Sequence, residues 1–172
     1  MFQQILREGD TKQELKKFRA NKMEKWFCKK YEELTKKEIH DLFALRAAVF
    51  VVEQDCIYQD IDGKDLFAHH ILGFTEKDQL FAYSRILAPG KGYSSCVAIG
   101  RIVIVLNYRK KNKGHELVHY SIEKAKALYP SCQIKISAQL HLSDFYASHG
   151  FKKEGKSYLE DGIPHIAMLL KK

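Results

Sequence analysis

The segment from Ser95 to Ala125 limits the fold of this chain more than any other. Its apolar start, Ser95 to Leu106, predicts a strand, which leads into a turn rich in Arg, Lys, Asn and Gly and then into an amphipathic helix from about Lys113 to Tyr129. Unpaired N–H groups and the dipole at a helix start attract anions, and Gly114 lets a phosphate approach the backbone closely. With Arg109 and three lysines beside it, the turn is predicted to hold a pyrophosphate. Its spacing fits neither a Walker loop nor a G-x-G-x-x-G loop.

The rest of the pattern predicts one mixed sheet with helices on its faces. Thr35 and Glu38 form a capping box ahead of helically spaced apolar residues that continue to Val52. A short helix is expected from Leu142 to Ser148. The other expected strands are Lys25 to Tyr31, Phe67 to Thr75, Gln79 to Leu87, Gln133 to Ala138, Lys152 to Leu159 and Ile163 to Leu170.

Composition limits the class of protein. The 172 residues suit one domain over residues 23–172, preceded by a polar, basic extension over residues 1–22. No run approaches the roughly 20 apolar residues of a membrane span, and the N-terminus lacks the apolar region of a secretory signal. Four single cysteines without a C-x-x-C pair fit a reducing cytoplasm. The net charge of +8 favours an anionic partner or a solvated basic end.

Two patterns resemble metal sites but fail on spacing. The acidic run within Asp55 to Asp65 lacks the register of an EF-hand calcium loop, so an ordinary polar loop is expected there. His69 and His70 are adjacent in sequence rather than one helical turn apart. No metal is therefore expected.

A second segment narrows the fold. Ile136 to Phe151 predicts a strand, a short helix carrying Phe145 and Tyr146, and then Gly150. A strand, a basic turn ending in glycine, a helix, another strand and an F-Y-x-x-x-G-F segment follow one another in the GNAT superfamily of acyl-CoA N-acyltransferases, which the chain resembles from about Met23 to its end. The pieces similar to the ElaA branch of that superfamily are Leu45 to Asp65, His70 to Gly73, Ala82 to Leu87, Ile99 to Ile104, Ala138 to Phe151 and Glu160 to His165.

The resemblance implies an α/β (α+β) GNAT fold: a mixed, mostly antiparallel sheet with two central parallel strands splayed apart and helices on both faces. Acetyl-CoA would lie between Cys96 to Val105 and Gln133 to Gln139, with backbone groups near Val103 and Val105 bonding the pantetheine and polarising the thioester. Asn112 stands where the family pattern has a glycine, but Asn tolerates left-handed backbone. The positions implied to contact CoA are Ile102, Val103, Ile104, Val105, Arg109, Lys110, Lys111, Asn112, Lys113, Gly114, His115, Gln139 and Phe145.

Tyr146 matches the tyrosine that protonates the departing thiolate in the superfamily, and the similar pKa values of a phenol and a thiol permit that transfer. The strand before the turn has no acid where the superfamily often has a Glu base. His70 is the preferred base, because it begins a strand expected to face the cleft and titrates near neutrality. Glu53, Asp161 and His165 are expected to contact the acceptor. The full set of candidate bases is Glu53, His70, His141, Glu160, Asp161 and His165, with a water chain as an alternative.

The resemblance thus implies a cytoplasmic N-acetyltransferase that passes an acetyl group from acetyl-CoA to a primary amine by direct attack in a ternary complex. The amine belongs to a small molecule or to a protein, and homodimers are common in the superfamily. The chief alternative is a non-catalytic acyl-CoA-binding or sensing module. A nucleic-acid binder led by the basic N-terminus is a second alternative, but the sequence has no nucleic-acid motif, so neither nucleic acid nor membrane is expected as a partner.

Overall fold

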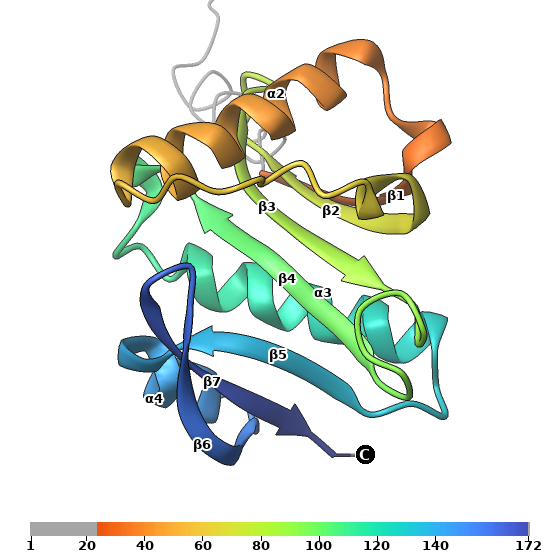
Figure 1. Cartoon of the computed structure of the whole chain (residues 1–172). Coiled ribbons are helices and arrows are strands. Elements are labelled where there is room, and N and C mark those ends of the chain that lie inside the picture. Colours follow the sequence, from red (N-terminus) through yellow and green to blue (C-terminus); the bar gives the residue numbers. More distant parts are fainter. Residues whose placement is uncertain (1–23, 172) are drawn as a thin grey trace, which may run out of the picture.

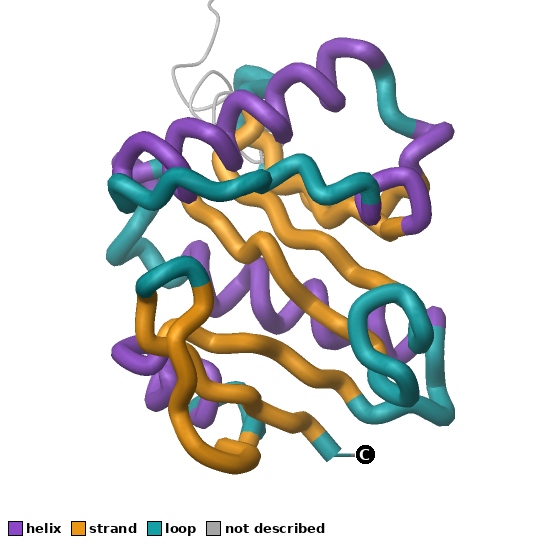
Figure 2. Tube along the Cα trace, viewed as in Figure 1, coloured by secondary structure: helices purple, strands orange, loops and turns teal. Residues whose placement is uncertain are grey.

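A computed structural model describes residues 24–171, so the expected N-terminal extension lies outside the described residues. Seven strands form one sheet in the order β1-β2-β3-β4-β5-β7-β6 (Figure 1 and Figure 2). The β4–β5 pair is parallel and all other neighbouring strands are antiparallel, which confirms the predicted mixed sheet. The strands are β1 (Lys25–Lys30), β2 (Ala68–Phe74), β3 (Leu80–Leu87), β4 (Val97–Ile104), β5 (Ile134–Gln139), β6 (Lys152–Glu160) and β7 (Ile163–Leu170).

Helix α2 (Lys36–Arg46) begins where the sequence predicts. The Thr35 N–H donates to the Glu38 carboxylate at 2.8 Å and the Glu38 N–H donates to the Thr35 hydroxyl at 3.2 Å, so the expected capping box is confirmed. The chain then continues as a π-helical stretch, Ala47–Glu53. Short 3-10 turns occur at Tyr31–Glu33, Lys64–Phe67, Leu106–Tyr108 and Leu140–Leu142.

Helices cover both faces of the sheet. Helix α2 lies on one face, while α3 (Lys113–Leu128) lies on the other (Figure 1) and α4 (Ser143–Ala147) packs into the same core as α3. Because successive strand residues point to opposite faces, the strands divide their apolar side chains between two cores. The core on the α2 side includes Leu42, Val49, Leu72, Phe74, Tyr83 and Val103, and that on the α3 side includes Ile71, Phe81, Ala82, Ile104, Leu117 and Ile122.

The two parallel strands pair only where they begin. Their register consists of two adjacent residue pairs, the first being Val97 opposite Ile134. Farther along β4, Arg101 has a left-handed backbone with φ of 54°, and the register with β3 shifts beside it. A bulge of this kind bends a strand away from its neighbour. Beyond their first residues, β4 and β5 therefore separate, as the family resemblance implies.

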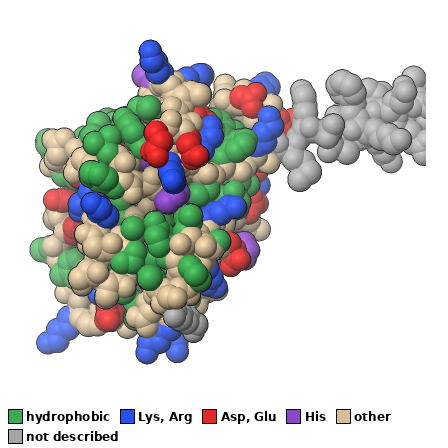
Figure 3. All heavy atoms as spheres, turned by 90° about the vertical axis from the view of Figure 1, so that its right-hand side faces the viewer, with side chains coloured by type: hydrophobic (Ala, Val, Ile, Leu, Met, Phe, Trp, Pro, Cys, Tyr) green, Lys and Arg blue, Asp and Glu red, His purple; other side chains and the backbone are tan. Residues whose placement is uncertain are grey.

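Two observations bear on a membrane or a nucleic acid as a partner. No helix in the described part of the chain is long and apolar enough to cross a membrane. On the face shown in Figure 3, Lys and Arg side chains are scattered among acidic and hydrophobic ones. That face therefore lacks the continuous basic stripe that nucleic-acid binders use.

Candidate active site

A cavity of about 690 Å³ opens where β4 and β5 separate. Its walls include Gly100, Arg101 and Ile102 from β4 and Ser137 and Gln139 from β5. The loops before β2 and β4, helix α4 and the β6–β7 hairpin supply the other walls. Since the two strands are not paired here, their backbone groups are available to a ligand lying between them.

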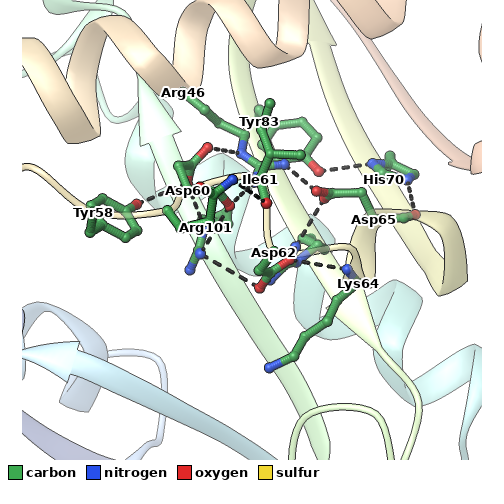
Figure 4. Close-up of polar contacts among 12 residues, drawn as sticks. Arg46, Tyr58, Asp60, Ile61, Asp62, Lys64, Asp65, His70, Tyr83 and Arg101 are labelled. Carbon is green, nitrogen blue, oxygen red and sulfur yellow. Dashed lines mark hydrogen bonds and ion pairs between the residues drawn. The ribbon is translucent and has the colours of Figure 1, made fainter.

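A buried ion cluster fixes the loop on one side of this cavity (Figure 4). Arg46 of α2 is fully buried, and it donates to Asp60 at 2.9 Å and to Asp65 at 2.7 Å. Arg85 of β3 donates to the same oxygen of Asp65 at 3.0 Å. We call Arg46, Arg85 and Arg101 with Asp60, Asp62 and Asp65 the Arg–Asp cluster. The predicted ordinary polar loop is thus an anchored segment, because Asp60, Asp62 and Asp65 each bind an arginine.

Arg101 connects the Arg–Asp cluster to the cavity. Its Nε donates to Asp60 at 2.7 Å, and its guanidinium lies 5.6 Å from the centre of the Tyr58 ring (Figure 4). Arg85 binds both oxygens of Asp62, at 2.7 and 2.8 Å. Burial opposes ionisation of Asp62, but the hydrogen bonds from Arg85 outweigh it and hold the pKa well below its ordinary value. The bulged residue of β4, Arg101, is therefore held by ion pairs to Asp60 and Asp62 of this loop.

The structure does not place His70 in the cavity. Its fully buried ring accepts from the Tyr83 hydroxyl at Nδ1 (2.8 Å) and donates from Nε2 to the Asp65 carbonyl oxygen (3.0 Å) (Figure 4). Burial lowers its pKa below the ordinary value. The expectation that His70 faces the cleft is wrong, because strand alternation turns position 70, like Leu72, toward α2.

The turn before α3 has the backbone shape of an anion-binding loop. Lys110 and Asn112 both adopt left-handed backbone, each with φ of 59°. Asn112 thus has the conformation that favours glycine at this position of the family pattern. The first amides of α3, from Lys113 onward, have no partner within the helix. A side chain at Gly114 would meet the Phe145 ring, at 3.5 Å, so the loop packs closely on α4.

Arg109 is already engaged at both ends of its guanidinium. Its terminal nitrogens contact the Glu53 carboxylate at 2.5 and 2.8 Å, while Nε donates to the Ile104 carbonyl oxygen at 2.9 Å. The hydrogen bond from Arg109 lowers the pKa of Glu53. Glu53 therefore lies at the basic turn and is not among the residues that line the cavity, which corrects its expected place beside the acceptor. Both side chains are open to solvent, with 33% and 40% of their surfaces exposed.

The other cations of the turn differ in availability. Lys113 is bound by two glutamates, at 2.6 and 2.8 Å. His115 has its Nδ1 2.9 Å from Nε2 of His149, so it packs against the end of α4. Lys110 and Lys111 are exposed. Two lysines and the backbone amides are thus the groups of this turn that are open to an anion.

The backbone groups of β4 that face the gap belong to residues one position away from those expected to bond CoA. The Val105 N–H donates to the Phe81 carbonyl oxygen at 2.9 Å, so this amide is used on the β3 side. Because backbone groups alternate sides along a strand, those of Ile104 and Ile102 point toward the gap. Ile102 also lines the cavity. The backbone groups of β4 that face the gap are therefore those of Ile102 and the N–H of Ile104, whose carbonyl oxygen is bound by Arg109, whereas the Val105 N–H faces β3.

Two contacts connect the segment after α2 to the opposite side of the gap. The Gln139 side-chain nitrogen donates to the Gln54 side-chain oxygen at 3.0 Å. The Cys56 thiol lies 3.5 Å from the Asp161 carbonyl oxygen. Gln139 is thus part of the cavity wall, and the β6–β7 turn is held close to the end of the π-helical stretch.

Tyr146 lines the cavity from α4 and is only 7% exposed. Its ring packs on Phe145 and Phe151, with centroids 5.0 and 6.2 Å apart. Burial raises the pKa of its hydroxyl to about 12. The phenol therefore stays protonated at neutral pH and can donate to a group inside the cavity.

The wall formed by the β6–β7 hairpin carries Tyr158, Glu160, Asp161 and His165. The His165 Nδ1 lies 2.8 Å from the Ile163 carbonyl oxygen. Since a carbonyl only accepts hydrogen bonds, Nδ1 carries the proton and Nε2 keeps its lone pair. Of the candidate bases, Glu160, Asp161 and His165 line the cavity, whereas Glu53, His70 and His141 do not.

Sequence reasoning missed the Arg–Asp cluster, although it left a signal. Arg46, Arg85 and Arg101 each interrupt an apolar helix or strand, and a buried cation there requires an acidic partner. The signal does not identify the partner, because Asp60 lies 14 positions from Arg46 and 41 positions from Arg101. Besides Tyr146, the cavity is lined by Tyr58, Tyr93 and Tyr158, and their sequence pattern does not separate these three from core aromatics.

Comparison with known proteins agrees with this geometry. The chain matches the acetyltransferase (GNAT) domain over residues 31–172. Protein ElaA of Escherichia coli is 41% identical over 148 residues, which cover 85% of this chain and 95% of ElaA. The crystal structure of Escherichia coli ElaA has a TM-score of 0.81 at 40% identity and covers 87% of this chain and 100% of that one. For an acyl-CoA N-acyltransferase from Pseudomonas aeruginosa the TM-score is 0.80 at 40% identity, over 86% and 99% of the two chains. The chain therefore belongs to the GNAT acetyltransferase family, and its relatives are ElaA-like proteins.

Proposed function

We propose that this chain transfers an acetyl group from acetyl-CoA to a primary amine in a ternary complex. The observation that carries the proposal is the separation of β4 and β5 after two residue pairs, with a cavity and Tyr146 at the gap. A gap of this kind leaves backbone donors free for an extended arm that ends in a thioester. The amine nitrogen attacks the thioester carbonyl carbon, so that a C–N bond forms, the C–S bond breaks and the thiolate leaves.

The turn before α3 would hold the diphosphate of CoA. Left-handed backbone at Lys110 and Asn112 and the unpaired amides at the start of α3 suit an anion. Exposed Lys110 and Lys111 add charge, and Arg109 can join them only by leaving Glu53. The backbone of Ile102 and Ile104 would then bond the pantetheine on the β4 side, and Gln139 would do so from β5.

Tyr146 would donate its proton to the thiolate. Its pKa of about 12 keeps the proton on the phenol at neutral pH, and the hydrogen bond to the departing thiolate would stabilise the charge that forms on sulfur. The amine must also lose a proton, and we propose His165, rather than His70, as the base that accepts it. Its Nδ1 is occupied by a carbonyl oxygen, so Nε2 is the acceptor, and the residue lies opposite Gln139 in the β5–β7 register.

The test is thiol release from acetyl-CoA with a panel of primary amines, together with calorimetric binding of CoA. Tyr146→Phe should lower kcat by about 10²–10⁴-fold while CoA still binds. Tyr129→Phe is the matched control, since that half-buried tyrosine is not a cavity residue. Binding of CoA without release of thiol for any amine would indicate an acyl-CoA sensor instead. Failure to bind CoA at all would end the proposal.

A further inference from the structure

Two carboxylates at the β6–β7 end of the cavity, those of Glu160 and Asp161, have no cation within ion-pair distance among the described residues. Tyr93, Ser137, Tyr158 and Glu160 all line the cavity, and we call them the acceptor-end cluster. The Ser137 hydroxyl lies 2.6 Å from the Tyr158 hydroxyl and 2.5 Å from Oε2 of Glu160. Tyr93 comes from the loop before β4, Ser137 from β5 and the other two from β6. Three separate parts of the fold therefore converge on one carboxylate.

The charges around this cluster favour a cation. Among the described residues, no Lys, Arg or His nitrogen lies within ion-pair distance of Glu160, and Asp161 beside it adds a second negative charge. Lys135 lies 5.2 Å above the Tyr93 ring, but it is paired with Glu154 at 2.5 Å. Burial first, and then the nearby Tyr158 and Glu160, raise the pKa of Tyr93 to about 12. Tyrosine faces and a free carboxylate are the groups that recognise an ammonium ion.

The positive side chains elsewhere in the cavity do not cancel this preference. Arg85 and Arg101 are neutralised within the Arg–Asp cluster by Asp62 and Asp60. Lys64 is exposed at the rim, on the loop that this cluster anchors. Its charge provides a rival hypothesis, in which the far end of the acceptor is a carboxylate, and the test below includes it.

Glu160 is held by Ser137, before Gln139 along β5, while Tyr158 of the same cluster stacks on His165 with ring centroids 6.4 Å apart. Ser137 precedes Gln139 by two residues, or about 7 Å at roughly 3.3 Å per strand residue. A carboxylate beside the reacting nitrogen would also stabilise the ammonium form, which cannot attack. Glu160 therefore suits a second positive charge on the acceptor, while the reacting nitrogen lies near His165.

We propose that the acceptor is an aliphatic amine with a second cationic group, as in an α,ω-diaminoalkane, and that the acceptor-end cluster binds this second charge. This inference rests on the proposed acyl transfer and adds the class of acceptor. Glu160 supplies the charge-assisted hydrogen bond, Ser137 fixes its carboxylate, and the faces of Tyr93 and Tyr158 contact the ammonium and the methylene chain.

The experiment uses the full chain, acetyl-CoA and three acceptors of equal chain length: a diaminoalkane, an n-alkylamine and an ω-amino acid. The diamine should have a kcat/KM about 2- to 5-fold above that of the monoamine, as expected for an ion pair with an exposed carboxylate. Glu160→Gln should remove this advantage by raising KM for the diamine, with KM for acetyl-CoA unchanged. Glu123→Gln is the control, since this exposed glutamate lies on α3, outside the cavity and away from the cluster.

Three results would overturn the inference: equal use of diamine and monoamine, preference for the amino acid, or a diamine advantage that survives Glu160→Gln. Calorimetry of the diamine with CoA present separates this inference from acyl transfer itself. If CoA binds but no amine is acetylated, diamine heat that disappears in Glu160→Gln supports the cluster and contradicts the catalytic proposal. If no diamine heat appears either, the cluster is not an amine site.

Discussion

Arginine meets carboxylate in two different ways in this protein. In the Arg–Asp cluster, Arg46 and Asp65 are at most 3% exposed, and each makes more than one charged contact. The Arg109–Glu53 pair is a bidentate contact between two side chains that are 33% and 40% exposed. Buried charges have no water to replace a lost partner, whereas exposed ones do. We infer that the first arrangement maintains the shape of the site and that the second can be exchanged for a ligand.

The largest effect is expected at the centre of the buried arrangement. Asp65→Ala leaves Arg46 and Arg85 each short of a partner inside the protein, and it should lower the free energy of unfolding by about 3–5 kcal/mol. Urea unfolding followed by circular dichroism measures this. Glu53→Ala, the equivalent change in the exposed pair, should cost less than about 1 kcal/mol. Similar losses in the two variants would remove the distinction between them.

The next effect concerns the position of β4 rather than stability. Arg101 holds Asp60 through its Nε at 2.7 Å and contacts the Asp60 carbonyl oxygen at 3.3 Å, and a lysine ammonium cannot keep both. Arg101→Lys should lower kcat/KM for acetyl transfer about 10-fold. The midpoint of thermal unfolding should change little, because the residue is partly exposed. Unchanged kinetics would show that the bulge does not need this side chain.

Acid should weaken the cluster with a defined sign. The pKa of Asp62 is depressed in the folded protein, so its contribution is complete above the unfolded value of about 3.9 and is lost as the pH falls below it. The difference in unfolding free energy between wild type and Asp62→Asn should be constant from about pH 8 to 5 and shrink below about pH 4. A difference that grows on acidification would contradict the assigned direction.

The smallest effect is expected at the exposed pair. Glu53→Gln frees Arg109 for the diphosphate, so CoA should bind about 2- to 5-fold more tightly at low ionic strength, with the unfolding free energy nearly unchanged. The gain should disappear at about 1 M salt, where the Debye length is only about 3 Å. Weaker CoA binding in this variant would mean that Glu53 orients Arg109 rather than competing for it.

The fold and the basic turn were predictable because their signals are local. Thr35 and Glu38 are three residues apart, and the strand, turn and helix around Gly114 are continuous in sequence. The Arg–Asp cluster was not predictable from local signals. Its ion pairs join α2, β3 and β4 to a loop whose sequence looks like an ordinary turn. His70 was misplaced for a related reason. The sequence predicts that a polar residue near a strand start faces the cleft. The register of β2 instead places the His70 side chain beneath α2.

The short pairing of β4 and β5 has a consequence for folding as well as for chemistry. Backbone pairing between the two halves of the sheet ends after Ala98 and Lys135, so from there on the halves are joined by side-chain contacts, such as the hydrogen bond between Gln139 and Gln54. A molecule that bonds to both edges restores continuity across this seam. At a concentration of 100 times its Kd, it would stabilise the whole domain by about 2.7 kcal/mol. In the proposed reaction, acetyl-CoA would bind between β4 and β5 like an additional strand, and CoA would leave once per turnover.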